Sequence, residues 1–345
     1  MSSFSGWGPT DDGRLVPVVV APGVNVVSAV GSSTDGSQGY ATLSGTSQAT
    51  PSVSGISTLI HDQRKRLNPS ATRLRPATVK AILTQTALDL GNRGPDFQFG
   101  YGRVNAQGAI DLVRADGFHE DQMTANGQVR EYGINVPTGQ PVLKVTLAWD
   151  DYPGSSLAAK ELVNDLDIEL IDPKGIIYRP WLLDPVNPST AATTGFDRTN
   201  NIEQVFVTSP VSGKWTVRVR GFQVPQVPQT YSLAASPPID KSPFPSISGF
   251  NPVYDKDGAT VPTFVFVFGS KFVVGATQVS VNGINQPIMQ VIDENLLIFQ
   301  LPSGNGARLD YLSSHGFISC PTRSRLPCIT ARTSTRSVST RYITR

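Results

Sequence analysis

The stretch LSGTSQATP at residues 43–51 places a serine, Ser47, in a run of small residues that leads into an apolar segment. This composition predicts a tight turn followed by a helix, with Ser47 at the helix N-terminus. Pro51 would lie in the first turn, where its missing N–H removes no intrahelical bond. Unpaired N–H groups and the helix dipole favour negative charge at such a terminus. Ser47 is therefore a candidate nucleophile with its own N–H near the oxyanion, and Gly45 and Thr46 are its neighbourhood. The alternative is a helix start capped by serine or threonine.

Four more segments accompany this stretch in order: FSGWGP at 4–9, PVVVAPG at 17–23, ATVKAILTQTA at 77–87 and FGYGRVNA at 99–106. Together with residues 43–51 they resemble the subtilisin-like serine proteases (subtilases). The resemblance covers about residues 4–113. It implies the C-terminal part of an α/β catalytic domain and a serine endopeptidase that forms an acyl-enzyme on Ser47 with a polypeptide substrate.

A serine nucleophile needs a base to take its proton and an acid to orient that base. In subtilases the chain order is Asp, His, Ser, whereas 46 residues precede Ser47 in this chain and none of them is histidine. His61, His119 and His315 all follow the serine. We therefore expect an incomplete chain that lacks the catalytic Asp and His and has little peptidase activity. The alternative is a non-catalytic binding or structural protein that retains a subtilase remnant as scaffold.

The composition of the chain limits the kinds of partner and the location that we expect. No apolar run approaches the length of a membrane span, and no signal peptide pattern occupies the N-terminus. The resemblance implies an extracellular or secretory location. The residues from 306 onward carry seven arginines against one acid, Asp310, so the rest of the chain is mildly acidic and gives nucleic-acid binding little support. Cys320 and Cys328 also lie in this tail.

From residue 114 the pattern changes to period-two alternation, which is typical of strands. Strands are predicted at 142–149, 162–170 and 214–220. This region resembles the jelly-roll β-sandwich that follows the catalytic domain in some subtilases. Four acids lie where its strands begin or end, and carboxylate oxygens are the ligands of Ca²⁺. The candidate calcium ligands are Asp150, Asp151, Asp165 and Asp167. Turn acids that solubilise strand ends are the alternative, and no cofactor is required.

The Pro-rich residues 238–246 are typical of a semi-rigid linker. Strands predicted at 263–269, 277–283 and 296–302 follow, and residues 247–305 resemble the immunoglobulin-like IPT/TIG fold. Such a domain implies a protein or carbohydrate partner, and we expect it to be cut short near residues 303–304. Residues 306–345 show no apolar period, so we expect a disordered basic tail or a frame-shifted end of the reading frame.

The sequence thus predicts a multidomain protein. Residues 1–113 are expected to form a partial α/β subtilase layer and residues 114–237 an all-β jelly-roll sandwich. An immunoglobulin-like sandwich at 247–305 and the tail follow the linker.

Overall fold

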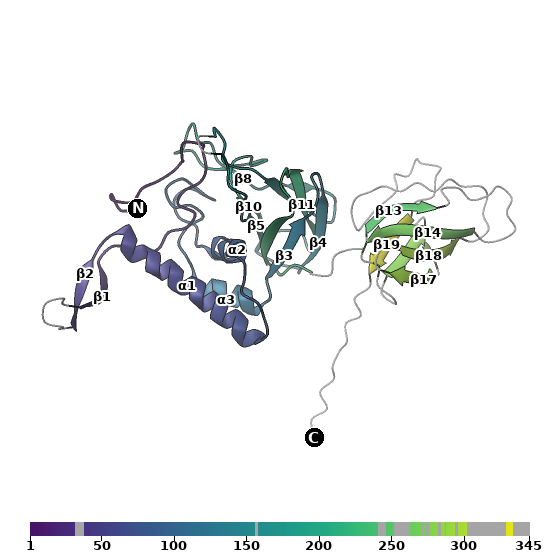
Figure 1. Cartoon of the computed structure of the whole chain (residues 1–345), viewed down its shortest axis with the longest axis horizontal. Coiled ribbons are helices and arrows are strands. Elements are labelled where there is room, and N and C mark those ends of the chain that lie inside the picture. Colours follow the sequence, from purple (N-terminus) through teal and green to yellow (C-terminus); the bar gives the residue numbers. More distant parts are fainter. Residues whose placement is uncertain are drawn as a thin grey trace, which may run out of the picture. The chain divides into compact units, whose positions relative to one another are not determined.

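The chain forms two compact units, Met1–Lys241 and Ser242–Arg345. In this computed structural model (Figure 1) the described residues are 1–31, 38–155, 158–240, 246–251, 263–270, 272, 277–281, 284–286, 288–293, 296–301 and 329–333. Among these residues, no helix combines the length and the apolar character that crossing a bilayer requires.

The first unit begins with a hairpin and three helices. The hairpin strands β1 (Val26–Gly31) and β2 (Gln38–Leu43) pair in antiparallel register and lead into helix α1 (Thr46–Leu67). Helices α2 (Pro76–Thr86) and α3 (Ala106–Arg114) follow. The helix predicted to follow the serine turn is α1, and its apolar residues Val53, Ile56 and Ile60 pack in the core built with the helices. Basic residues in its last turn suit the negative end of the helix dipole.

The apolar run Val18–Ala21 has the composition of a buried parallel strand, and it forms one parallel bridge between Val20 and Arg103. The backbone bonds beside it have ordinary lengths: Tyr101 N–H donates to the Val18 carbonyl at 2.9 Å, and Val20 N–H donates to the Gly102 carbonyl at 3.0 Å. The expectation of a parallel strand is therefore reduced, within the described residues, to a single bridge. Among the described residues, the backbone hydrogen bonds of this segment go to Tyr101, Gly102 and Val104 along one edge.

Ten short strands follow in the first unit, with the bounds β3 (Phe118–Met123), β4 (Val129–Val136), β5 (Val142–Trp149), β6 (Asp165–Ile171), β7 (Ile177–Tyr178), β8 (Trp181–Leu182), β9 (Thr193–Thr194), β10 (Ile202–Thr208), β11 (Gly213–Gln223) and β12 (Gln229–Ser236). They form two four-stranded antiparallel sheets, β10-β5-β12-β3 and β4-β11-β6-β7, and a two-stranded sheet β8-β9. The prediction of strand 142–149 is confirmed in full by β5.

The two four-stranded sheets enclose one core, which contains Trp149 and Tyr231 from the first sheet and Tyr132 and Trp215 from the second. The outer face of sheet β10-β5-β12-β3 is also buried. Its Ala148 belongs to a second core built with the helices. The structure establishes these sheets and their strand order, and the jelly-roll assignment stays a prediction.

Helix α2 lies against this outer face (Figure 1). Proline is favoured in the first helical turn because its missing N–H is unpaired there in any case, and Pro76 opens α2. On the buried side of α2, the Thr78 hydroxyl lies 2.8 Å from the Ser232 hydroxyl, and Gln85 Nε2 donates to the Lys144 carbonyl at 2.8 Å. These contacts fix α2 on the sheet; α3 packs against α2, and α1, which carries Ser47, packs against α3.

The second unit contains β13 (Ser246–Asn251), β14 (Thr263–Ser270), β15 (Thr277–Val281), β16 (Ile284–Gln286), β17 (Ile288–Asp293), β18 (Leu296–Leu301) and β19 (Ile329–Thr333). These strands form the sheets β13-β14-β18-β17 and β16-β15-β19. Its core includes Val265, Val279 and Phe299. Since β14 alternates buried Val265 with exposed Phe264 and Phe266, its strand prediction is confirmed. The IPT/TIG assignment stays a prediction.

The structure describes residues in two places where a domain boundary was expected, the C-terminal tail and the start of the linker. Residues 329–333, expected to be disordered, form β19, which pairs along β15 from Val281–Ile329 to Thr277–Thr333. The expectation was wrong there because ITART is rich in β-branched residues and an open strand edge accepts them. The rest of the tail lies outside the described residues. At the start of the predicted linker, Ile239 is 4% exposed in the first core and Asp240 N–H bonds the Gly133 carbonyl at 2.7 Å, so these residues belong to the first unit.

Candidate functional site

Ser47 is the second residue of α1 and is exposed. Gly45 occupies the N-cap position in an extended conformation, so the chain turns from β2 into the helix over two residues. No acidic residue lies in the first turn to oppose the positive end of the helix dipole. The predicted placement of Ser47 at a helix N-terminus is therefore confirmed, and its neighbours Gly45 and Thr46 lie in the same turn.

The turn before Ser47 is fixed by a close approach of two glycines. Gly45 N–H donates to the Gly23 carbonyl at 2.7 Å. A Cβ on Gly23 would lie 2.6 Å from the Gly45 carbonyl oxygen and 3.2 Å from the Ala49 methyl. Only glycine fits at position 23 without moving the backbone that presents Ser47.

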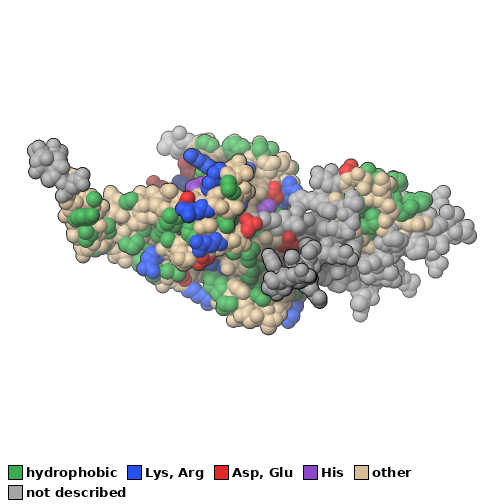
Figure 2. Space-filling model, turned by 90° about the horizontal axis from the view of Figure 1, so that it is seen from below, with side chains coloured by type: hydrophobic (Ala, Val, Ile, Leu, Met, Phe, Trp, Pro, Cys, Tyr) green, Lys and Arg blue, Asp and Glu red, His purple; other side chains and the backbone are tan. Residues whose placement is uncertain are grey.

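The described residues around Ser47 in the sequence carry no charged side chain. Among the described residues from 15 to 61 there is no Asp, Glu, Lys or Arg. Figure 2 shows the hairpin end of the first unit in green and tan, with the blue and red side chains further along. The electrostatic field that these described residues provide at Ser47 is therefore that of the helix N-terminus.

Pro51 lies inside α1, in its second turn, which corrects the expectation of a first-turn proline. The helix accepts it although one backbone bond is lost. Hydroxyl groups bond back to carbonyls one turn earlier: Thr50 Oγ1 to the Thr46 carbonyl at 3.1 Å and Ser54 Oγ to the Thr50 carbonyl at 3.3 Å. This half of α1 is exposed, and a Cβ on Gly55 would meet open space.

Neither described histidine accompanies Ser47. His61 lies on α1 about 21 Å further along the axis, at 1.5 Å per residue. His119 lies on β3, where its ring packs edge-on against the Tyr132 ring with centroids 4.9 Å apart. His315 lies outside the described residues. Ser47 therefore lies where a nucleophile would lie, but neither of these two histidines is placed to act as its base.

The four predicted calcium ligands separate into two groups. Asp165 and Asp167, buried at 2% and 4% exposure, come together in β6 around a single guanidinium. Arg198 Nη1 lies 2.9 Å from Asp165 Oδ1 and 2.5 Å from Asp167 Oδ1, and Lys160 Nζ lies 3.5 Å from Asp165 Oδ2. Burial raises the pKa of Asp165, and the Arg198 charge opposes that effect.

Asp150 and Asp151 accept backbone hydrogen bonds. Asp150 Oδ2 accepts from Ala77 N–H at 3.0 Å, at the N-terminus of α2, where a carboxylate is favoured by the dipole. Asp151 accepts from Val163 N–H at 2.7 Å and Asn164 N–H at 2.9 Å. In the described part of the chain no group of three or more His, Cys, Asp or Glu residues is placed to hold a metal ion. A calcium site stays a prediction that this arrangement does not support.

Sequence reasoning missed Arg198 and did not single out Glu203 as a site residue. Glu203 in β10 is 1% exposed; its Oε2 accepts from Ile168 N–H at 2.8 Å, while no described residue bonds its Oε1. Burial, with Asp197 and Asp167 nearby, raises the pKa of Glu203 well above its usual value. The one available signal was the charge pattern of Asp197-Arg198, which cannot show which acids the arginine meets.

Comparison with known proteins finds similarity to subtilases in the first part of the chain. Residues 1–102 match the subtilase family model. A serine protease/ABC transporter B family protein tagA of Dictyostelium discoideum is 26% identical over 266 residues, which are 67% of this chain and 15% of that protein. That alignment is longer than the family match, so it includes residues of the β-rich region.

Two bacterial proteins are similar over a shorter part. Serine protease AprX of Bacillus subtilis is 38% identical over 120 residues, 32% of this chain and 25% of AprX. A C5a peptidase of Streptococcus pyogenes is 34% identical over 116 residues, 33% of this chain and 9% of the peptidase. The chain thus spans between 9% and 25% of the length of these three relatives.

Proposed function

We propose that residues 1–102 are the serine-bearing part of a subtilisin-like serine endopeptidase, with Ser47 as its nucleophile. The observation that carries the proposal is the exposed serine at the second position of α1, behind a turn in which Gly23 tolerates no side chain. The family match over residues 1–102 and the relatives named as serine proteases support it. The substrate class is polypeptide.

In the proposed reaction the Ser47 hydroxyl oxygen bonds to the carbonyl carbon of a peptide bond as a base takes its proton. The oxyanion then lies by the N–H groups of the first turn of α1, at the positive end of its dipole. Collapse of this intermediate breaks the C–N bond, the amine leaves with a proton, and water releases the acyl group.

The expected rate of peptide hydrolysis by this chain depends on whether a base lies beside Ser47. Since neither His61 nor His119 is placed beside Ser47, we expect this polypeptide alone to hydrolyse peptides very slowly. Loss of triad members lowers kcat by about 10⁴ to 10⁶. A binding or structural protein that keeps the serine turn as scaffold is the second candidate, and this isolation of Ser47 is the observation that favours it.

A fluorophosphonate probe tests the proposal, because it reacts with an activated serine. With the full chain we expect slow labelling that added imidazole accelerates, since imidazole supplies a base. Ser47→Ala should abolish the imidazole-dependent labelling. Ser52→Ala, which removes another exposed serine of α1, should leave it unchanged.

Labelling that survives Ser47→Ala would refute the role of Ser47. Fast labelling without imidazole would instead show a complete site and contradict the expectation of low activity. Complete absence of Ser47 labelling with imidazole would favour the non-catalytic alternative. An extracellular location, and a protein or carbohydrate partner for residues 247–305, stay predictions that accompany the proposal.

A further inference from the structure

Lys144 is a half-buried lysine inside a sheet. Its neighbours in β5, Leu143 and Val145, face the core between the sheets, so Lys144 lies on the opposite face, which α2 covers. Gln85 in the last turn of α2 donates its side-chain N–H to the Lys144 carbonyl at 2.8 Å. Lys144 therefore lies beside the C-terminal end of this helix.

The neighbours of Lys144 on this face carry no charge. The register pairs Lys144 with Phe206 of β10 on one side and with Ser236 of β12 on the other. Directly opposed residues of an antiparallel pair share a face, with Cβ atoms about 5 Å apart. Val142 and Thr146, two positions away in β5, lie on the same face. The ammonium group thus lies beside an aromatic ring and uncharged groups, where a charge is poorly solvated.

Two charged residues of the segment after α2 lie near this position. Burial lowers the pKa of Lys144 to about 8, although the nearby Asp89 carboxylate opposes this change. The described residues give Lys144 Nζ neither an ion pair nor a hydrogen bond. Arg93 lies over the Phe206 ring, with Cζ 5.9 Å from the ring centroid, so it places a second positive charge at the ring beside Lys144.

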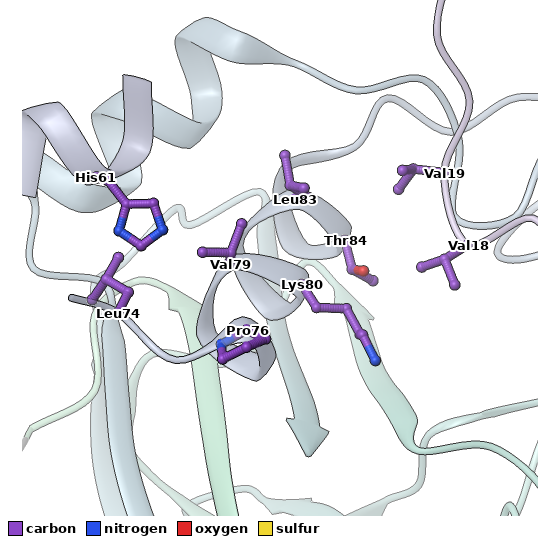
Figure 3. Close-up of a pocket in the computed structure, with 9 residues that line it drawn as sticks. All are labelled: Val18, Val19, His61, Leu74, Pro76, Val79, Lys80, Leu83 and Thr84. Atoms are coloured by element: carbon purple, nitrogen blue, oxygen red, sulfur yellow. The ribbon is translucent and has the colours of Figure 1, made fainter. Parts of the chain in front are cut away.

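The unpaired amine is open to solvent. The described side-chain atoms that are buried without a partner include Thr84 Oγ1 of α2 and do not include Lys144 Nζ. A lysine attacks an electrophile through its neutral amine. At pH 7.4 about a fifth of an amine with a pKa near 8 is neutral, against about 0.1% of an ordinary lysine. Lys80 is also half-buried, but Figure 3 shows its side chain extended from α2 in the groove over the outer side of this helix.

We propose that Lys144 is the lysine of the first unit that small acyl phosphates modify first. The neutral Nζ bonds to the acyl carbon, the C–O bond to the phosphate breaks, and phosphate leaves with the bonding electrons and one proton from the nitrogen. A small donor suits an amine that is half-buried between strands, and an anionic leaving group suits the positive charge of Arg93. The product is a neutral amide, so the reaction removes a charge from uncharged surroundings. This site does not depend on the proposed peptidase function.

Acetyl phosphate, with tryptic digestion and mass spectrometry of the full chain, tests the proposal by comparing lysines of the same molecules. At pH 7.4 Lys144 should be acetylated about tenfold faster than exposed Lys65 and Lys174, because its larger neutral fraction outweighs the lower nucleophilicity of a weaker base. Lys80, the matched half-buried lysine, should also react more slowly than Lys144. The rate at Lys144 should level off above about pH 8.5, whereas the rate at Lys65 should rise to about pH 10.

Two variants separate an activated amine from an accessible one. Asp89→Asn keeps an acceptor for the Gly94 N–H, which Asp89 Oδ2 binds at 3.0 Å, and should speed acetylation of Lys144 about twofold. Asp62→Asn, in an exposed acid of α1, should leave that rate unchanged. Lys144→Met should raise the melting temperature at pH 7, and this gain should shrink between about pH 8 and pH 10.5, because the cost of burying the charge disappears there.

The proposal is overturned if Lys144 reacts no faster than Lys65 or Lys80, or if its rate rises with that of Lys65 up to pH 10. It is also overturned if Asp89→Asn fails to speed the reaction at Lys144. A gain from Lys144→Met that stays constant between pH 8 and pH 10.5 would show that the folded chain does not disfavour the ammonium form, and this result overturns the proposal as well.

Discussion

Helix α1 and strand β6 each carry predicted functional residues, but their surroundings are opposite. Ile60 is the one buried residue among the 22 described in α1, whereas every residue of β6 except Glu169 is buried. Ser47 therefore lies on an element that is mostly open to solvent. Asp165 and Asp167 lie in the framework, where Arg198 pairs with both carboxylates and Lys160 pairs with Asp165. The proposed nucleophile thus lies on a mostly exposed helix, whereas the acids predicted to bind calcium lie in a buried strand and form ion pairs.

The largest contrast should emerge when the same truncation is made in both regions. Leu147 in β5 is fully buried in the core between the sheets, and Leu59 in α1 is 50% exposed. We expect Leu147→Ala to lower the free energy of unfolding by about 2–5 kcal/mol and Leu59→Ala by about 0.5 kcal/mol or less. Urea denaturation followed by circular dichroism measures both. Similar losses for the two variants would mean that α1 is covered in solution.

The second contrast concerns two arginines. Arg198, with its side chain 32% exposed, neutralises two buried carboxylates, and Arg66 pairs with Asp62 on the surface of α1, where both side chains are more than half exposed. Arg198→Met should cost about 2–3 kcal/mol, because it leaves buried charges unpaired. Arg66→Met should cost less than about 1 kcal/mol. Equal effects in denaturant titrations would show that the buried cluster contributes no more than a surface pair.

Glu203 should make the stability of the buried β-sheet region depend on pH. Its pKa is raised in the folded chain by burial and by Asp197 and Asp167, so the folded state holds a proton that the unfolded state has lost above about pH 4.5. Stability from this group therefore falls as pH rises from that point toward the folded pKa. Glu203→Gln removes this dependence, and its melting temperature relative to the original chain should rise between pH 5 and pH 8. A constant difference across that range would contradict a protonated Glu203.

The smallest effect should come from calcium. An ion bound at Asp165 and Asp167 would have to displace the Arg198 guanidinium, and Asp150 and Asp151 already accept backbone bonds. We expect millimolar CaCl₂ to move the melting temperature of the full chain by less than about 1 °C. A larger, saturable increase that EDTA reverses would restore the predicted calcium site.

Local patterns were predictable where the local chain decides the outcome. The bounds of β5 follow from strict alternation, since Leu143, Val145 and Leu147 all face one core. The start of α1 at the serine turn was also predictable, because small residues and the N-terminal position of Ser47 are local properties. The same holds for β14, where valine and phenylalanine alternate between the inside and the outside.

Features that depend on distant partners were not predictable. Val18–Ala21 has the composition of a buried strand, but its partner is a single bridge to Arg103. The role of Asp165 and Asp167 depends on Arg198, whose position beside β6 no periodicity in the sequence encodes. The unpaired Thr84 hydroxyl depends on the packing of α2 beside Val18 and Val19. Residues 329–333 were expected to be unstructured because their partner, β15, is far away in the chain.

The sheet β10-β5-β12-β3 has one further consequence, since Val145 and Leu147 on one side and Ala148 and Ala234 on the other belong to different cores. Removing the helices would expose the apolar side chains on one face of this sheet to solvent. Removing β4, β6 and β11 would expose those on the other face. The first unit should therefore melt in a single calorimetric transition. Cleavage of the chain between α3 and β3 should give two fragments of which neither folds alone. The turn that carries Ser47 should therefore unfold together with the sheet.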